Sequence, residues 1–213
     1  MPEVRDTHVT WTDSGLSEAT TESGEAVSVT KGNTVELERW QDAKKPALVY
    51  WTWSDEEDKR GKDTKKTDRN TWDNEQVARA ARLYTCYRVD AKDVPASTLA
   101  KLGVSQVPFV QVVSNDRLAV ASTVPGSSNA MEGFLRTNLQ RHFAEYWRAV
   151  LARAQELAKK LDEAKAAMKK KDFDGAVSAC GEIMNDDVRT ETLDKARDLL
   201  AQARAKAAKE AKK

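Results

Sequence analysis

The chain holds few residues of the types that carry out chemistry in proteins. Its two cysteines, Cys86 and Cys180, lie far apart in the sequence and form neither a CxxC pair nor a disulfide framework. We expect both to be buried free thiols that pack as small hydrophobic side chains. A redox role for Cys86 is disfavoured, because burial within a strand raises the pKa of a thiol and blocks access to it.

The two histidines do not indicate catalysis either. His8 lies in a segment without clear periodicity, and His142 lies beside an apolar helical face, where a packing role is expected. The sequence therefore supports no nucleophilic or proteolytic triad. We expect no catalytic site, no cofactor and no metal.

Residues 55–70 form the most polar stretch of the chain and contain no apolar side chain. Their acids do not follow the spacing of an EF-hand calcium loop, and the lysines between them oppose cation binding. Their basic residues do not indicate nucleic-acid binding, since the interleaved acids cancel the field and no aromatic residue is present for base stacking. We expect a solvated, mobile loop that buries nothing.

The bulk composition indicates a soluble protein of two units. Lys and Arg number 35 and Asp and Glu number 34 among 213 residues, which gives no general attraction to nucleic acid or to an anionic membrane. The first residues lack the apolar run of a secretory signal, and no window approaches the ~20 apolar residues that span a bilayer. We expect a soluble, cytoplasmic protein without membrane insertion, or a periplasmic one if a signal was removed.

The elements that would position a site begin with a buried strand at 47–54. A capping box at Asn33 and Glu36 predicts a helix that leads into this strand, and residues 1–32 are expected to form an extended arm or a short hairpin. After the polar run, Asp73 is expected to cap a helix. Further along, the patterns predict a strand at 83–89, a helix at 96–102, and a hairpin of strands at 106–113 and 117–123. This order predicts an α/β fold with a parallel βαβ unit before an antiparallel hairpin.

From Ser128 onward the hydrophobic period is helical. No Pro or Gly interrupts residues 134–172, which favours one long helix, with a break near Arg141 as the alternative. An apolar seam follows this helix at Phe143, Trp147, Val150, Ala154, Leu157, Leu161, Ala164 and Met168. Residues 172–185 and 188–209 are expected to add two more helices. The C-terminal part is therefore predicted to be all-α.

Several segments resemble thioredoxin-like proteins. Residues 44–59 are similar to the first central strand and active-site loop of that family, and residues 72–93 to its following helix and second strand. Residues 97–117 resemble the stretch with the cis-proline, and LGVSQVPFV is the most specific part. The resemblance implies a thioredoxin-like domain at 33–142, a central mixed sheet flanked by helices, between the arm at 1–32 and the helical extension at 143–213.

The sequence departs from that family at its reactive site. Family members use a CxxC motif at the start of a helix, whereas alignment of the strands places Glu56 and Lys59 at the two cysteine positions. Neither side chain forms a thiolate, and the segment that follows has no apolar face for a helix to bury. The resemblance therefore implies a redox-inactive member.

Pro108 is the family position whose role, peptide binding, does not depend on the missing thiols. The resemblance implies a cis bond before Pro108, a groove beside it, and peptide binding at Trp53, Ser54, Val107 and Pro108. The plainer interpretation is that Pro108 begins a strand, where its missing N–H is harmless.

Residues 161–187 resemble a tetratricopeptide unit, and residues 192–203 resemble the start of a second. About one and a half units are present, and isolated repeats do not bury their faces alone, since at least three are usually needed. A plain three-helix bundle is the alternative. Apolar surface left over on these helices would favour a homo-oligomer or docking to a partner.

The function expected from these features is that of a protein-binding or scaffold module with a protein or peptide partner. The alternative is a glutathione-transferase-like enzyme, or a glutathione-binding protein, that uses Ser54 or Trp53 near the bound thiol. The late start of the first strand and the small helical part oppose that alternative.

Overall fold

The computed structural model describes residues 9, 11–13, 45–114, 118–186, 188 and 191–210. The chain divides into two compact units, residues 1–144 and 145–213. The helix predicted to precede the first strand and most of the N-terminal arm lie outside the described residues, as does the tip of the predicted hairpin at 115–117.

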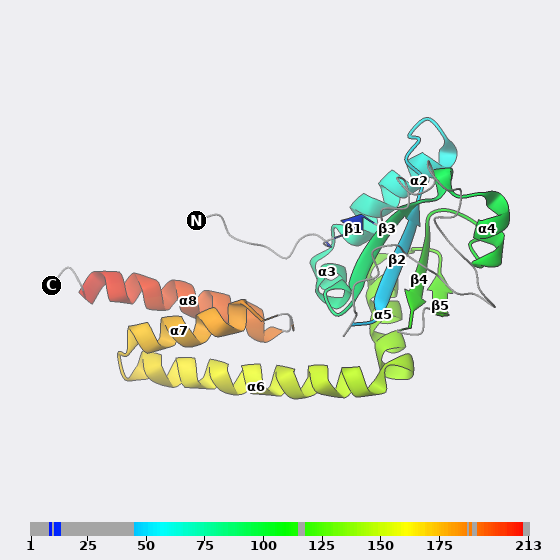
Figure 1. The fold of residues 1–213 in the computed structure, drawn as a ribbon. Coiled ribbons are helices and arrows are strands. Elements are labelled where there is room, and N and C mark those ends of the chain that lie inside the picture. Colours follow the sequence, from blue (N-terminus) through cyan, green and yellow to red (C-terminus); the bar gives the residue numbers. More distant parts are fainter. Residues whose placement is uncertain are drawn as a thin grey trace. The chain divides into compact units, whose positions relative to one another are not determined.

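A five-stranded mixed sheet forms the centre of the first unit (Figure 1). Its strands lie in the order β1-β3-β2-β4-β5. β3 is parallel to both β1 and β2, whereas β4 is antiparallel to β2 and to β5. The strands are β1 (Thr12–Asp13), β2 (Ala47–Thr52), β3 (Thr85–Asp90), β4 (Phe109–Val113) and β5 (Ala119–Thr123). The predicted α/β architecture, with a parallel unit before an antiparallel hairpin, is confirmed.

β2 is the central strand, and every residue in it is buried. Because successive side chains point to opposite faces of the sheet, both faces are covered at β2, which explains why the run is apolar throughout. Cys86 pairs with Leu48 of this strand and is buried, as predicted.

A buried polar chain of hydrogen bonds links the sheet to a helix. The Trp51 indole N–H donates to Gln111 Oε1 at 2.8 Å, and Gln111 Nε2 donates to the Leu102 carbonyl at 2.7 Å. Leu102 is the C-cap of α4 (Ala96–Lys101). Because buried polar atoms are costly without partners, this chain holds α4 in one place against the sheet.

The described part of the N-terminal arm belongs to the sheet. β1 adds a short parallel edge strand beside β3. The centroid of the Trp11 ring lies 5.3 Å from that of Tyr50, in a tilted arrangement, and 4.9 Å from that of Trp72, in an edge-to-face arrangement. Burial raises the pKa of the Tyr50 hydroxyl, and the nearby Asp68 carboxylate raises it further.

The polar run is helical, so the prediction of a solvated loop was wrong. Residues after Asp58 form α2 (Lys59–Thr67), which continues into the π-helical turn η1 (Asp68–Trp72). Gly61 and Thr64 are buried, so the expectation that the run buries nothing was also wrong. The helix needs no apolar face, because small and polar residues make its contacts with the rest of the unit.

α3 (Glu75–Ala81) follows η1, but its N-cap is Asn74 and not the predicted Asp73. The Asn74 side chain accepts hydrogen bonds from Gln76 N at 2.9 Å and Val77 N at 3.3 Å. Asp73 instead ends η1, which the sequence pattern did not indicate. α3 packs against α5 (Ser128–His142), and the Tyr84 hydroxyl donates to the Leu135 carbonyl at 2.6 Å.

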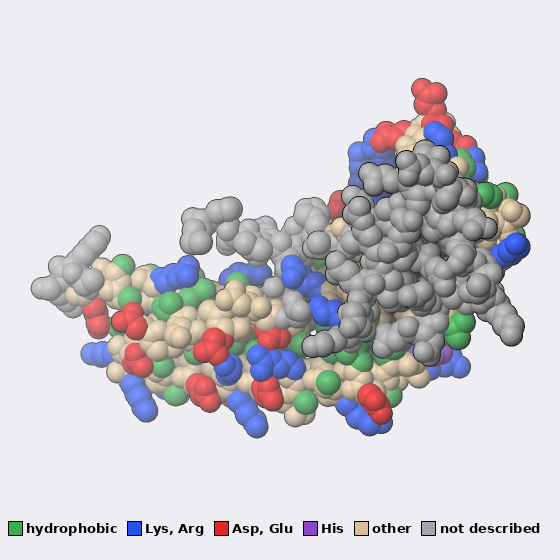
Figure 2. Space-filling view, viewed as in Figure 1, with side chains coloured by type: hydrophobic (Ala, Val, Ile, Leu, Met, Phe, Trp, Pro, Cys, Tyr) green, Lys and Arg blue, Asp and Glu red, His purple; other side chains and the backbone are tan. Residues whose placement is uncertain are grey.

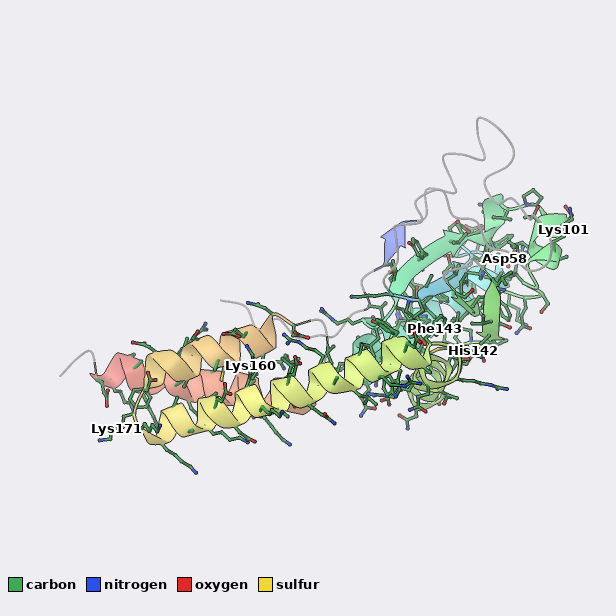
Figure 3. All side chains as sticks on the ribbon, turned by 60° about the horizontal axis from the view of Figure 1, so that its bottom comes forward. Asp58, Lys101, His142, Phe143, Lys160 and Lys171 are labelled. Atoms are coloured by element: carbon green, nitrogen blue, oxygen red, sulfur yellow. The ribbon has the colours of Figure 1, made fainter. Side chains whose placement is uncertain are left out.

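The long helical stretch is interrupted, as in the second of the two alternatives. α5 ends at His142, and Phe143 has a non-helical backbone with φ −133° and ψ 46°. Figure 3 labels both residues at this interruption.

The described residues of the second unit form three helices, α6 (Ala144–Lys169), α7 (Phe173–Met184) and α8 (Glu191–Glu210). The all-α character of the C-terminal part is confirmed. Its core takes one face from each helix and contains Leu157, Leu161, Ala164, Cys180, Ile183 and Ala196. Four positions of the predicted seam on α6 are buried, namely Val150, Leu157, Leu161 and Ala164.

Candidate functional site

A groove in the first unit runs beside the start of β4, next to Pro108. The Val107–Pro108 peptide bond is cis. The loop before it is set by the end of α4, where Gly103 adopts a left-handed backbone with φ 73° and Val104 N donates to the Leu99 carbonyl at 2.8 Å. Pro108 is buried and Val107 is half-buried, so the two residues form a firm apolar wall.

α2 and η1 form the opposite wall. The backbone N–H of Trp53 donates to Thr64 Oγ1 at 3.2 Å, which ties α2 to the end of β2. At Gly61 an added Cβ would lie 1.8 Å from the Asp55 carbonyl oxygen, so only glycine fits at this approach. These two contacts explain how a helix without apolar residues is held in place.

The third wall is the segment between β5 and α5. The Thr71 hydroxyl donates to the Gly126 carbonyl at 2.7 Å, which joins η1 to this segment. The Ser127 side chain then caps α5 by accepting from Ala130 N at 3.3 Å. π-helical turns such as η1 are frequent at functional sites, and this one borders the groove.

The groove has a volume of about 580 Å³ and a mixed lining. Its apolar part comes from Val107, Pro108, Val124 and Pro125. Its polar part includes Asp63, Lys66, Asn70 and Gln106. Asp63 and Lys66 are exposed, and in the part of the chain that the structure describes neither forms an ion pair. Both charges therefore remain available to a ligand.

Two of the four residues expected to bind a peptide line the groove. Val107 and Pro108 line the groove, whereas Trp53 and Ser54 lie outside its lining. The Trp53 ring packs against the sheet core, and the Arg60 guanidinium covers it at 3.4 Å from the ring centroid. Ser54 is exposed, and its N–H donates to Asp90 Oδ1 at 3.3 Å.

The positions aligned with the family cysteines carry charged side chains at the start of α2. Glu56 is exposed and pairs with Lys65 at 2.6 Å. Lys59 is the first residue of α2 and is also exposed. Between them, Asp58 caps the helix, and its hydrogen bonds with Arg60 lower the pKa of the carboxyl to about 2. The helix N-terminus is therefore occupied by a carboxylate of the chain itself.

Neither cysteine is a reactive thiol. Burial raises the pKa of Cys86 to about 12, and its sulfur donates to the Ala81 carbonyl at 3.3 Å. Burial also raises the pKa of Cys180, which packs in the core of the helical unit. A thiolate, which is the nucleophilic form, is therefore strongly disfavoured at both positions at neutral pH.

Within the described residues there is no group of three or more His, Cys, Asp and Glu side chains that could hold a metal ion. Among the described helices, none combines the length and the apolar character that crossing a bilayer requires.

Sequence reasoning did not find the two other walls of the groove. Gly61 and Thr64 lie three residues apart on α2, which places them on one helical face. That spacing of two small residues inside a polar run was the available signal. The contact of Thr71 with Gly126 spans 55 residues and left no local pattern.

The sequence matches no protein-family model, and no curated protein matches it.

Proposed function

We propose that this protein is a redox-inactive, thioredoxin-like binding module that holds an extended peptide in the groove beside Pro108. The observation that carries this proposal is the open groove of about 580 Å³, with Val107 and Pro108 in one wall and α2 in the other. The module has no enzymatic role, and its helical unit, which resembles tetratricopeptide repeats, offers further surface for a partner.

The chemistry of the lining supports a peptide ligand. A peptide presents backbone amides and carbonyls at regular intervals, with side chains between them, and therefore needs both polar partners and apolar contacts. Asn70 and Gln106 each supply both a donor and an acceptor, and Val124 leaves 47% of its surface exposed at the rim. An apolar ligand without hydrogen-bonding groups would leave those amides without partners.

The side chains near the groove support a binding role over a redox role. None of the described residues in the lining is a cysteine, and the positions aligned with the family thiols are Glu56 and Lys59. Cys86, with a pKa raised to about 12, is not a substitute.

The proposal is tested by selecting ligands and then blocking the groove. Displayed random heptapeptides are selected on the full chain, and the enriched sequence is synthesised and titrated by calorimetry. Val124→Arg fills the rim and should weaken binding by about tenfold or more, the loss typical of a central contact. Leu118→Arg is the matched control, since Leu118 is 43% exposed but lies outside the described lining.

The control variant should bind the peptide like the wild type. Equal binding by both variants, or no enriched sequence at all, would reject the peptide groove. A glutathione titration separates the enzymatic alternative, because saturable binding with release of a proton from the glutathione thiol would overturn the proposal of a non-enzymatic module.

A further inference from the structure

The helical unit carries a second cavity, at the end where α6 turns into α7. It has a volume of about 380 Å³. Four lysines line it: Lys169 ends α6, Lys171 lies in the turn that follows, and Lys206 and Lys209 come from the last turns of α8. Figure 3 shows Lys171 at this turn. A single acid, Glu210, belongs to the same lining, so the charge around the cavity is four positive against one negative.

Some lysines of the same unit have an acidic partner, whereas these four have none among the described residues. Lys160 pairs with Glu182, and Lys165 pairs with Asp162 at 2.8 Å. On the visible face of α6, basic and acidic side chains are interspersed (Figure 2). Within the described part of the chain, none of the four lysines around the cavity forms an ion pair. A negatively charged ligand would offset this surplus of positive charge.

The cavity also has an apolar component. Phe173 is 8% exposed and Met168 is half-buried, and both belong to the lining. Because Phe173 is nearly buried, it contributes to the floor of the cavity, while the exposed lysines form the rim. The shape of this site therefore suits a ligand with an apolar group flanked by negative charges.

Lys171 is held in a backbone conformation that glycine would adopt at lower cost. Its φ is 63°, and the surrounding hydrogen bonds, from Lys171 N to Met168 O and from Asp172 N to Ala167 O, are those of a Schellman ending of α6. Glycine is the usual residue there, since a side chain is disfavoured at positive φ. A lysine at this position lowers the stability of the fold, and strained backbone conformations of this kind concentrate at functional sites.

We propose that this cavity, the lysine pocket, binds an acidic peptide segment. One apolar side chain of the peptide enters the cavity, and the carboxylates on either side of it in the peptide contact the lysines. The charge surplus fits the carboxylates, and the apolar floor fits the side chain. A flat membrane surface would not fill a concave site. The proposal concerns the helical unit alone and is independent of the groove beside Pro108.

The probe is a fluorescently labelled pentapeptide, Glu-Glu-Leu-Glu-Glu, blocked at both ends and titrated against the full chain by anisotropy. Saturable binding is expected at about 0.05 M salt and should weaken strongly at about 0.5 M, where charges are screened. A peptide with Gln in place of each Glu should not bind, and a peptide with Gly in place of Leu should bind more weakly. Equal binding of the Gln peptide would overturn the proposal.

Charge reversal locates the site. Lys206→Glu and Lys209→Glu should each weaken binding by about tenfold, because an attraction becomes a repulsion of similar size. Lys159→Glu changes the net charge equally, at an exposed position of α6 outside the described lining, and should leave affinity unchanged. Equal losses of affinity in all three variants would show a general attraction of the peptide to the positive charges of the protein, and would overturn the proposal of a specific site.

Lys171→Gly tests the backbone argument. This variant should raise the midpoint of thermal unfolding, since glycine suits positive φ, and should weaken peptide binding at the same time. A stabilised variant that binds the probe like the wild type would remove Lys171 from the site. Binding to phosphatidylserine vesicles that is lost in Lys206→Glu, together with no binding of the peptide, would replace the proposed ligand by a membrane.

Discussion

α2 in the first unit and α7 in the second are helices of similar length that are held in opposite ways. α7 buries Phe173, Ala176, Cys180 and Ile183, an apolar face of ordinary kind. α2 buries only Gly61 and Thr64. The energy of apolar burial follows the buried area, so it changes little when a helix shifts slightly. A close backbone approach and a single hydrogen bond depend on distances between particular atoms, so they are more sensitive to such a shift. The groove is therefore bordered by a helix whose position depends on two residues.

The largest effect is expected in α7, where Ile183→Ala removes a side chain that is 1% exposed. Loss of transfer energy and the cavity left behind should lower the free energy of unfolding by about 2 to 5 kcal/mol. Urea denaturation followed by circular dichroism measures this change in the free energy of unfolding. Leu151→Ala, at a position of α6 that is 45% exposed, should change stability little. Comparable losses in both variants would show that Ile183 is not part of a packed core.

A smaller but more local effect is expected at Gly61. Gly61→Ala places a methyl group against the Asp55 carbonyl, so α2 must move away from the loop after β2. The free energy of unfolding should fall by about 1 to 3 kcal/mol. Gly133→Ala is the matched control on α5, where an added Cβ meets nothing within 4 Å, and it should stabilise by up to about 1 kcal/mol. Urea denaturation compares the two. An equal gain in both variants would contradict the close approach at Gly61.

Thr64→Val isolates the single hydrogen bond. The change keeps the shape of the side chain but removes the acceptor for the Trp53 N–H, and it should cost about 1 kcal/mol. Thr64→Ser retains the hydroxyl and should restore much of the loss. Hydrogen exchange at the Trp53 amide, followed by NMR, should accelerate in the valine variant and not in the serine variant. An unchanged exchange rate at the Trp53 amide in the valine variant would show that this hydrogen bond does not hold α2 in place.

The smallest effect concerns the cap of α2. Hydrogen bonds with Arg60 lower the pKa of Asp58 to about 2. A depressed pKa stabilises the fold above the unfolded value of about 3.9, and the contribution is lost as the pH falls through the folded value. Asp58→Asn should therefore melt below the wild type at pH 6, and the difference in melting temperature should shrink toward pH 2. A difference independent of pH would show that the charge of Asp58 does not matter.

Much of the sheet could be predicted because its signals are local. The apolar run at 47–54 and the aromatic and β-branched run at 83–89 predicted buried strands, and the structure has strands at Ala47–Thr52 and Thr85–Asp90. The three C-terminal helices followed from the spacing of their apolar residues. The groove was less accessible, since its walls come from four segments and only Val107 and Pro108 had a local pattern around them.

The amino-acid sequence by itself determined the strands β2 to β5, the apolar helices and the absence of a CxxC pair, because each of these depends on residue type and short spacing. Only the tertiary structure decided that residues 59–67 form a helix, since the Asp55 carbonyl and the Trp53 amide that hold it lie outside that segment. It also decided that four lysines from two distant stretches surround one cavity. Hydrophobic periodicity records what a segment buries, whereas close approach and charge clustering depend on where the rest of the chain is placed.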